Sequence, residues 1–245
     1  MADRFYLPDL PRSGSATLTG DEAHHLSRVR RLAAGAPVVL FDGRGQACHA
    51  VVTDVAKHAV ALELGEELAE VAAPVDLTLA SAVPKGERFD WLVEKATELG
   101  VSRLVPLIAE RSVVEPRDAK LDRLRRSIVE ACKQCGRSRL MVLDDPVPLR
   151  AFLEIERSAR RMIAHPGDGR LQNGDGAASA ALAIGPEGGF TDREVEDALA
   201  MGWSAVSLGP TLLRIETAGI AAAAVVLAEG WVGGDSRADR SETTA

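Results

Sequence analysis

The sequence predicts an α/β protein in which a small β-rich domain precedes a larger domain built on a mostly parallel sheet. Residues 1–70 contain short apolar runs separated by a glycine-containing turn, a pattern typical of antiparallel strands. From Pro74 onward, apolar strands alternate with helical segments, which indicates a parallel sheet covered on both faces. The 245 residues, 46% of them hydrophobic and 27% charged, have the composition of an ordinary globular protein.

The amino-terminal domain is expected to contain a β-hairpin. Apolar runs at 38–41 and 47–52 flank the turn-forming tetrad Asp42-Gly43-Arg44-Gly45. A further strand is expected at 59–65, so the domain should be a small barrel.

A short helix is expected before this hairpin. Thr19 and Glu22 have the spacing of a capping box, which predicts that Thr19 caps a helix through His24-His25-Leu26. The domain should end near Glu70–Pro74, where a Glu/Ala-rich stretch meets a proline.

The carboxy-terminal domain, 74–232, shows the alternation of strands and helices. One expected helix, 89–99, carries its apolar residues on one face and is followed by Gly100, a residue that commonly ends helices. Another is a basic amphipathic helix at 119–132. The expected strands are 75–80, 101–108 (interrupted at Pro106), 162–164, 180–184 and 205–208. The tail 233–245 is expected to be disordered.

The distribution of charge favours an anionic partner, although the net charge is −7. The segment 117–139 holds eight basic residues against three acidic ones, a local net charge of +5. A second cluster contains Arg28, Arg30 and Arg31. Clustered cations in an acidic chain are typical of nucleic-acid binding, and the alternative is that each cluster is a solvated helix face.

The chain is expected to be cytoplasmic and to bind no metal. Its start has no secretory pattern, and its most apolar stretch, 220–228, is too short to cross a bilayer. Cys132 and Cys135 have the C-x-x-C spacing, but no second such pair completes a metal site. We therefore interpret these cysteines as structural.

Three strand ends lead into unusual loops: His165-Pro166-Gly167, Gly185-Pro186-Glu187-Gly188-Gly189-Phe190, and Gly209-Pro210-Thr211-Leu212-Leu213-Arg214. Their glycines and prolines allow sharp turns and a close approach of backbone to a ligand. Backbone donors and acceptors suit a nucleoside, and neither the dinucleotide-binding nor the P-loop fingerprint is present. The alternative is that they are ordinary tight turns. Thr191 and Glu194 follow with capping-box spacing, which predicts a helix start.

At these loops the sequence resembles the RsmE family of 16S ribosomal RNA (uracil-N3) methyltransferases. Two segments resemble the family's central motifs: Ile184-Gly185-Pro186-Glu187-Gly188-Gly189-Phe190, and Leu208-Gly209-Pro210-Thr211-Leu212-Leu213-Arg214-Ile215-Glu216-Thr217-Ala218. Similar segments elsewhere are 25–31, 85–88, 94–101, 110–112 and 134–137, so the resemblance covers nearly the whole chain. Two departures, Lys133 in place of an acidic residue and Arg30 in place of an apolar one, both add positive charge.

The resemblance implies a PUA-like domain at 1–70 and a SPOUT domain with a trefoil knot at 74–232. It also implies a homodimer that uses S-adenosylmethionine and no metal. The substrate would be a uridine, number 1498, of 16S rRNA, either free or in the assembled small ribosomal subunit. By motif, the cofactor would be held by His165, Pro166, Ile184, Gly185, Pro186, Glu187, Gly188, Gly189, Leu208, Gly209, Leu213 and Arg214.

Methylation of uracil N3 requires loss of the N3 proton and stabilisation of the resulting negative charge. Arg214 and Arg111 are the candidates for electrostatic stabilisation. Glu216 is the candidate proton acceptor; the alternatives are that it orients Arg214 or caps the final helix. RNA binding is expected at Arg28, Arg31, Arg123, Arg125, Arg126, Arg137 and Arg139.

Three other interpretations remain at this point. A non-catalytic RNA-binding protein would need the basic clusters but not the glycine-rich loops. A small-molecule α/β enzyme would use the loops but not the clusters. A SPOUT methyltransferase with a different target nucleotide would need both.

Overall fold

The computed structural model describes residues 2–70, 73–167, 169–171 and 177–232. The chain forms two compact units. The first contains Met1–Ala72 and Asp122–Met141, and the second contains Ala73–Leu121 and Val142–Ala245. The first unit thus includes Asp122–Met141, a segment that the predicted boundary near 70–74 places in the second domain. The domain bounds 1–70 and 74–232 stay a prediction, and the expected tail lies outside the described residues.

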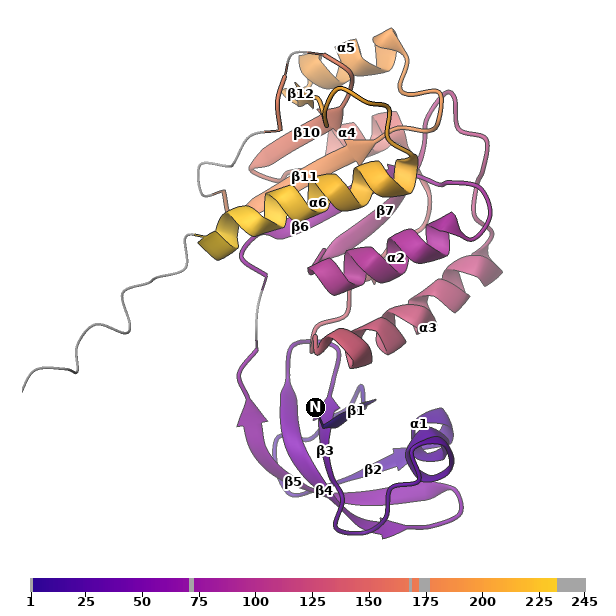
Figure 1. Ribbon diagram of the computed structural model, residues 1–245, viewed down its shortest axis with the longest axis vertical. Coiled ribbons are helices and arrows are strands. Elements are labelled where there is room, and N and C mark those ends of the chain that lie inside the picture. Colours follow the sequence, from indigo (N-terminus) through magenta and orange to yellow (C-terminus); the bar gives the residue numbers. More distant parts are fainter. Residues whose placement is uncertain (1, 71–72, 168, 172–176, 233–245) are drawn as a thin grey trace, which may run out of the picture. The chain divides into compact units, whose positions relative to one another are not determined.

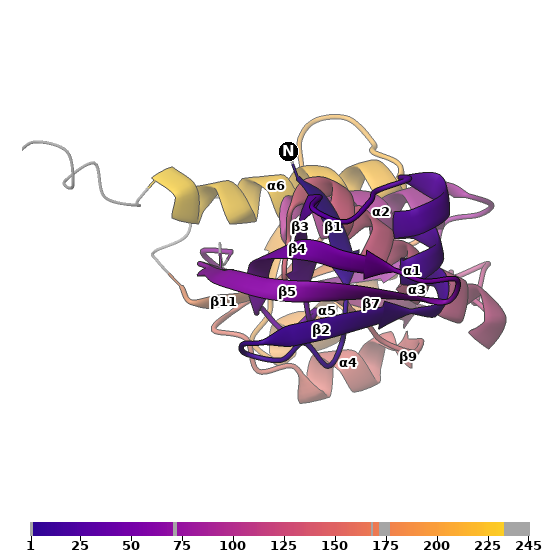
Figure 2. The ribbon, with the colours of Figure 1, turned by 90° about the horizontal axis from the view of Figure 1, so that it is seen from below.

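The first unit contains a five-stranded sheet with the strand order β1-β3-β4-β5-β2. β1 pairs with β3 in parallel and the other pairs are antiparallel. Figure 2 shows the long strands β4 and β5 side by side, with β2 along the other edge of β5. The expected hairpin is confirmed as β3 and β4. The strands are β1 (Asp3–Tyr6), β2 (Ser15–Thr19), β3 (Pro37–Phe41), β4 (Ala47–Val55) and β5 (Ala59–Leu68).

The helical segment after β2 is present and Thr19 is its N-cap residue, but the expected capping-box hydrogen bond to the Thr19 side chain is absent. α1 (Gly20–His24) continues into a π-helix, η1 (His25–Val29), and Thr19 makes no side-chain cap hydrogen bond. Glu22 is used differently, because its carboxylate accepts the backbone N–H of Tyr6 at 3.1 Å. A contact from another part of the unit therefore replaces the local cap.

Helix α3 (Asp118–Cys135) contributes Lys133 to the interior of the first unit. The Lys133 side chain is only 5% exposed, and its Nζ lies 2.6 Å from Glu22 and 2.9 Å from Glu130. A buried cation is tolerated when it is paired. Arg30, the other departure from the family pattern, forms an ion pair with Asp3. Both added charges are therefore neutralised within the protein.

The second unit is built on a parallel sheet, as predicted. Among the described residues its strand order is β12-β10-β11-β6-β7-β8, with β9 also paired to β7, and every pair is parallel. The strands are β6 (Asp76–Ala82), β7 (Arg103–Ile108), β8 (Val142–Leu143), β9 (Val147–Pro148), β10 (Arg160–Ala164), β11 (Ser179–Ile184) and β12 (Ser204–Val206).

Helices cover both faces of this sheet. In Figure 1, α6 crosses in front of β6 and β11, and α4 lies behind the sheet. α6 packs against α2, whereas α4 contacts α5 and β7. On the α4 side, the rings of Phe152 and Trp203 lie 5.6 Å apart within one apolar cluster. The helices are α2 (Arg88–Leu99), α4 (Leu149–Ile155), α5 (Asp192–Ala200) and α6 (Ile215–Val232).

The prediction that Pro106 interrupts a strand is wrong. β7 runs through it, and Pro106 is the register partner of Ser81 on β6. On the other side of β7, β8 pairs with Arg103–Leu104 and β9 with Leu107–Ile108, so neither strand pairs with Pro106. The missing N–H of a proline costs no ladder hydrogen bond where no neighbouring strand needs it.

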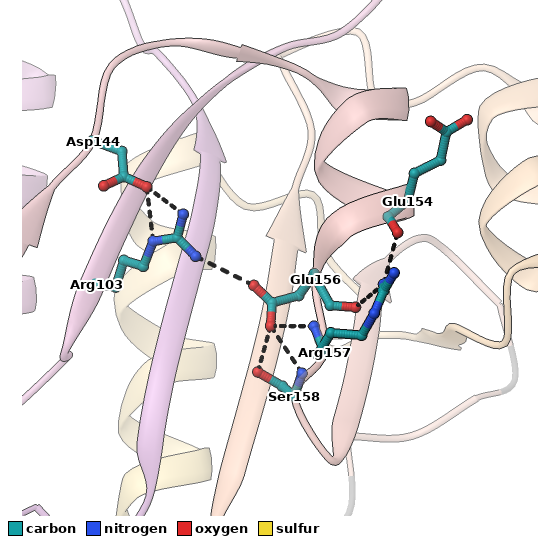
Figure 3. Close-up of polar contacts among 6 residues, drawn as sticks. All are labelled: Arg103, Asp144, Glu154, Glu156, Arg157 and Ser158. Carbon is teal, nitrogen blue, oxygen red and sulfur yellow. Dashed lines mark hydrogen bonds and ion pairs between the residues drawn. The ribbon is translucent and has the colours of Figure 1, made fainter.

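A buried carboxylate, Glu156, joins the segment before β10 to the start of β7 and to Asp144, which follows β8 (Figure 3). Its Oε1 accepts hydrogen bonds from the Ser158 hydroxyl at 2.8 Å and from the backbone N–H groups of Arg157 and Ser158 at 2.8 and 2.9 Å. Its Oε2 lies 3.5 Å from Arg103, which also pairs with Asp144. Burial alone raises the pKa of Glu156, but these hydrogen bonds and the charge of Arg103 together lower it below its usual value.

Glu156→Gln should therefore destabilise the protein in a pH-dependent way. A carboxylate with a lowered pKa stabilises the folded state above its unfolded pKa of about 4.3, and this contribution is lost as the pH falls through the lowered value. We expect a loss of about 1–3 kcal/mol in the free energy of unfolding at pH 7, as for a hydrogen-bonded charged group. The difference from wild type should shrink when urea unfolding is repeated near pH 3. Glu154→Gln, on the exposed side of α4, is the control and should change stability little. A loss of stability in Glu156→Gln that is the same at pH 7 and pH 3 would show that the ionised carboxylate is not what stabilises the fold.

Candidate functional site

A cavity of about 230 Å³ lies where the expected loops follow β10, β11 and β12. Because these strands are parallel neighbours of one sheet, their carboxyl ends meet at one edge. The cavity is lined by Ala164, His165, Pro166, Ile184, Gly185, Pro186, Glu187, Gly189, Ser207, Leu208, Gly209, Pro210, Thr211, Leu212, Leu213, Ile215 and Ala218.

Two glycines show why the loops need these residues. A Cβ on Gly185 would lie 3.1 Å from the backbone nitrogen of Phe190 and 3.2 Å from its ring, so a side chain there would disturb the turn. Gly209 has a φ of +127°, a conformation that other residues rarely adopt. The sequence therefore forms the lining largely from backbone atoms.

The segment after β11 is fixed by the capping box that the sequence predicts. The Thr191 hydroxyl accepts the Glu194 N–H, and Glu194 accepts the Thr191 N–H at 2.8 Å. Glu194 also accepts the backbone N–H of Glu110 at 2.8 Å, which ties in the loop after β7. The start of α5 thus anchors two loops.

Ten of the twelve residues predicted to hold the cofactor line this cavity; Gly188 and Arg214 do not. Gly188 faces Arg111, whose Nη1 donates a hydrogen bond to the Gly188 carbonyl at 2.7 Å. A Cβ on Gly188 would lie 3.2 Å from Cδ of Arg111. Gly188 therefore contacts a neighbouring side chain, and Arg111 holds the loop at this point.

The lining also includes residues that were not among the predicted cofactor contacts. Ile215 and Ala218 belong to the first turn of α6 and lie three positions apart, so they share one helix face. That spacing, directly after a glycine-rich loop, is the signal that could have identified them.

The chemistry of the lining fits a nucleoside carrying a cationic group. Aliphatic side chains such as Ile184, Leu208 and Leu213 supply apolar walls for a planar base. His165 and Glu187 are the ionisable side chains among the described lining residues. The Glu187 carboxylate would favour positive charge, as on a sulfonium or an amine.

A second cavity, of about 880 Å³, lies in the same unit beside α2 and the start of α6. It contains two of the predicted catalytic residues, Arg214 and Glu216. Its lining is Lys85, Gly86, Glu87, Arg88, Asp90, Trp91, Glu94, Arg214, Glu216 and Thr217. Arg111 is not part of this lining.

Glu216 is only 8% exposed, and its Oε2 has no hydrogen-bond partner within the described part of the chain. The interpretation that Glu216 caps α6 therefore has no supporting hydrogen bond among these residues. A buried carboxylate without a partner is costly to the folded state, and such groups concentrate at functional sites.

The segment Leu213–Ala218 lines both cavities. Leu213, Ile215 and Ala218 contribute to the smaller one, whereas Arg214, Glu216 and Thr217 contribute to the larger. This short segment at the start of α6 therefore lines the smaller cavity and also carries two of the three expected catalytic side chains, Arg214 and Glu216.

The seven arginines predicted to bind RNA all belong to the first unit. Arg139 is held by Glu70 through two hydrogen bonds of 2.8 Å, and Arg125 pairs with Asp122 at 3.0 Å. Burial lowers the pKa of Arg137, and Arg123 also has a partner. These four guanidinium groups are engaged within the protein.

The other three, Arg28, Arg31 and Arg126, are exposed and form no ion pair with any described residue. Arg31 has a φ of +54°, and Arg28 lies in the π-helix. Unusual backbone of this kind is more frequent at functional sites.

The two cysteines of the C-x-x-C pair lie in the last turn of α3. The pKa of Cys132 is raised, first by the hydrogen bond of this thiol with Cys135 and then by burial. A thiol with a raised pKa is a poor nucleophile. Within the described residues, no group of three or more His, Cys, Asp or Glu side chains could hold a metal ion.

None of the described helices combines the length and the apolar character needed to cross a membrane.

Two family models match the chain. The model of an RNA methyltransferase domain matches residues 71–227, and that of an RNA methyltransferase PUA domain matches residues 18–65. Together they cover the glycine-rich loops, strands β3 and β4, and most of β5.

Two relatives are named ribosomal RNA small subunit methyltransferase E. The protein of Synechocystis sp. is 35% identical over 221 residues, covering 86% of this chain and 72% of the relative. That of Mycobacterium bovis is 32% identical over 243 residues, covering 93% and 92%.

Solved structures show the same fold. The ribosomal RNA small subunit methyltransferase E of Neisseria gonorrhoeae, bound to S-adenosyl methionine, matches with a TM-score of 0.84 and 32% identity, covering 91% of this chain and 96% of that one. A protein of Legionella pneumophila with bound SAM matches with a TM-score of 0.83 and 32% identity, covering 93% and 98%. The chain therefore belongs to the RNA methyltransferases of the ribosomal RNA small subunit methyltransferase E family, with a PUA-like domain followed by a parallel-sheet domain of the SPOUT type.

Proposed function

We propose that this protein methylates N3 of a uridine in 16S ribosomal RNA, with S-adenosylmethionine as the methyl donor. Membership of the family supports methylation of ribosomal RNA with this cofactor. The choice of uracil N3, and of uridine 1498, is the finer part of the proposal.

One observation carries the proposal: the segment Leu213–Ala218 lines a nucleoside-sized cavity and a cavity that contains a buried, unpaired carboxylate. A methyltransferase needs a donor site next to an acceptor site. Residues of this segment line one cavity or the other in turn, so the two cavities lie next to each other and can serve as the donor site and the acceptor site.

S-adenosylmethionine supplies an electrophilic methyl group when it is bound. In the neutral uracil, N3 carries a hydrogen, so its lone pair becomes available only when the proton leaves. The Glu216 carboxylate accepts this proton in our proposal, and the N–H electrons remain on the base. The Arg214 guanidinium stabilises the negative charge that develops on the uracil oxygens. These two side chains account for the step, so the proposal includes no metal.

Arg111 stays a second candidate for electrostatic stabilisation. Its hydrogen bond to the Gly188 carbonyl supports a positioning role, in which it holds the loop after β11 in place. The remaining donors of its guanidinium are available to a substrate.

The target base must be unpaired or flipped out, because N3 lies on its Watson–Crick edge. We propose that the seven arginines of the first unit hold the surrounding RNA by its phosphates. Arg28, Arg31 and Arg126 are the strongest candidates, since they have no competing ion pair among the described residues.

A homodimer is part of the proposal. α6 is apolar around much of its circumference, and Val225 on it remains 39% exposed. An apolar helix face is normally covered, and a second copy of the chain would cover it. We also place the enzyme in the cytoplasm, because its substrate is ribosomal RNA, either free or in the small subunit.

The cofactor cavity is tested by Leu213→Trp, which adds bulk to its lining. Leu199→Trp, on the exposed side of α5, is the matched control. We expect titration calorimetry to show that Leu213→Trp weakens S-adenosylmethionine binding by about tenfold or more, with the control close to wild type. A wild-type protein that binds neither S-adenosylmethionine nor S-adenosylhomocysteine, with or without RNA, would favour a non-catalytic RNA-binding protein.

The proton acceptor is tested by Glu216→Gln, which keeps the shape of the side chain. We expect methyl transfer to 16S rRNA or to small subunits to fall by about 10²–10⁴-fold, the usual contribution of general-base catalysis. The Tm should stay the same or rise, because an unpaired buried charge is removed. Glu98→Gln, on the exposed face of α2, is the control. A variant that loses stability together with activity would indicate a structural role.

The product of the same reaction identifies the target. Methylation at N3 blocks base pairing, so reverse transcription of the methylated RNA should stop beside the modified uridine. A stop at another nucleotide, or a methyl group on another atom in mass spectra of the digested RNA, would refute the finer proposal and leave the methyltransferase assignment in place.

The RNA contacts are tested by salt titration of the affinity for 16S rRNA fragments. Arg126→Gln should lower the slope of log affinity against log salt by about 0.7 for a single-stranded contact. Arg139→Gln is the comparison, because Glu70 already holds that guanidinium. Equal effects of the two substitutions would show that existing ion pairs do not determine which arginines bind RNA.

A further inference from the structure

The larger cavity contains a side chain that the proposed methyl transfer does not use. Trp91 lies on α2 and is 44% exposed, and it lines the cavity that holds Arg214 and Glu216. The core-facing residues of α2 are Phe89, Leu92, Val93, Ala96 and Thr97, so Trp91 is not part of the packing against the sheet. An exposed indole beside a functional cavity offers a flat surface for a ligand.

The charges around Trp91 favour an anion. Two of the carboxylates in the lining have a cationic partner: Asp90 lies 3.3 Å from Lys120, and Glu94 shares Lys95 with Glu98, each at 2.7 Å. Lys85, Arg88 and Arg214 are exposed and form no ion pair among the described residues. They face only two remaining carboxylates, Glu87 and Glu216. Three exposed cations of the described lining are therefore available to an anionic group.

The loop that carries Lys85 and Arg88 is held in place. Lys120 Nζ donates a hydrogen bond to the Gly86 carbonyl at 3.0 Å and lies 5.8 Å from the centre of the Phe89 ring. Because the backbone between the two cations is anchored, less ordering entropy is lost when they bind a ligand.

We propose that this cavity binds a nucleotide adjacent to the target uridine, with its base stacked on Trp91 and its phosphate held by Lys85 and Arg88. The inference rests on the proposed function, which requires the target base to leave its stack. A neighbouring base that loses its partner in this way regains stacking energy on an aromatic side chain. With a volume of about 880 Å³, the cavity has room for more than the reacting uracil.

The test uses the full-length protein and a fluorescein-labelled octauridylate as a single-stranded probe. Trp91→Ala should weaken binding about 5- to 100-fold, the range expected for the loss of one stacked base. Trp91→Phe, which keeps an aromatic face, should restore most of the affinity. Ile155→Ala, which removes an exposed apolar side chain elsewhere in the unit, should bind as wild type does.

Two further measurements separate stacking from other roles of Trp91. Base stacking quenches indole fluorescence, so the unlabelled octauridylate should quench the wild type but not Trp91→Phe. Arg88→Gln should lower the salt slope by about 0.7, whereas Arg150→Gln on α4 should not. The S-adenosylmethionine affinity and the molecular mass in light scattering should be the same in Trp91→Ala and in the wild type.

Unchanged octauridylate affinity in Trp91→Ala would overturn the inference. A change in oligomeric mass would also overturn it, because Trp91 would then belong to a subunit interface. The proposed function fails separately: if the wild type transfers no methyl group to 16S rRNA, the stacking result still shows whether this cavity binds single-stranded RNA.

Discussion

The parallel register of β10, β11 and β12 is the constraint on which the rest of the site depends. Ile163 pairs with Ala183 on one side and with Ala205 on the other, so the three strands end at nearly the same level. Their following loops must then converge, and glycine or proline at each strand end lets the backbone turn without side chains filling the space. The capping box at Thr191 and the hydrogen bond from Arg111 to Gly188 hold the central loop in that position.

The beginning of α6 combines two opposing requirements. The helix needs apolar residues to pack on the sheet, and Ile215 and Ala218 provide them together with part of the smaller cavity. The same turn holds the buried Glu216 carboxylate without a partner in the described structure. The positive end of the helix dipole partly offsets the cost of this charge. A site that sacrifices some stability for reactivity is common in enzymes.

Much of this fold and site could be predicted from local sequence patterns. The three loops, ten of the residues that line the smaller cavity and the capping box at Thr191 follow from residues close together in the chain. The expectations that the structure contradicts failed because of contacts between residues far apart in the sequence. Thr19 and Glu22 have the spacing of a capping box, but Glu22 instead contacts Tyr6 and Lys133. Pro106 continues its strand because β8 and β9, on one side of β7, leave a gap beside it. The larger cavity combines residues of α2 with others more than a hundred positions later, so no local pattern could indicate it.

The pairing of charges explains how an acidic protein can bind RNA. The chain has a net charge of −7, yet many of its acidic groups are used internally. Glu70 holds Arg139, Glu22 holds Lys133 and Glu94 holds Lys95, and each pair removes one cation and one anion from the field that a ligand experiences. Our proposals place the RNA phosphates at cations that remain accessible, such as Arg126 in one unit and Arg88 in the other. We therefore expect the positions of unpaired cations to indicate the RNA site better than the total charge or the density of basic residues along the sequence.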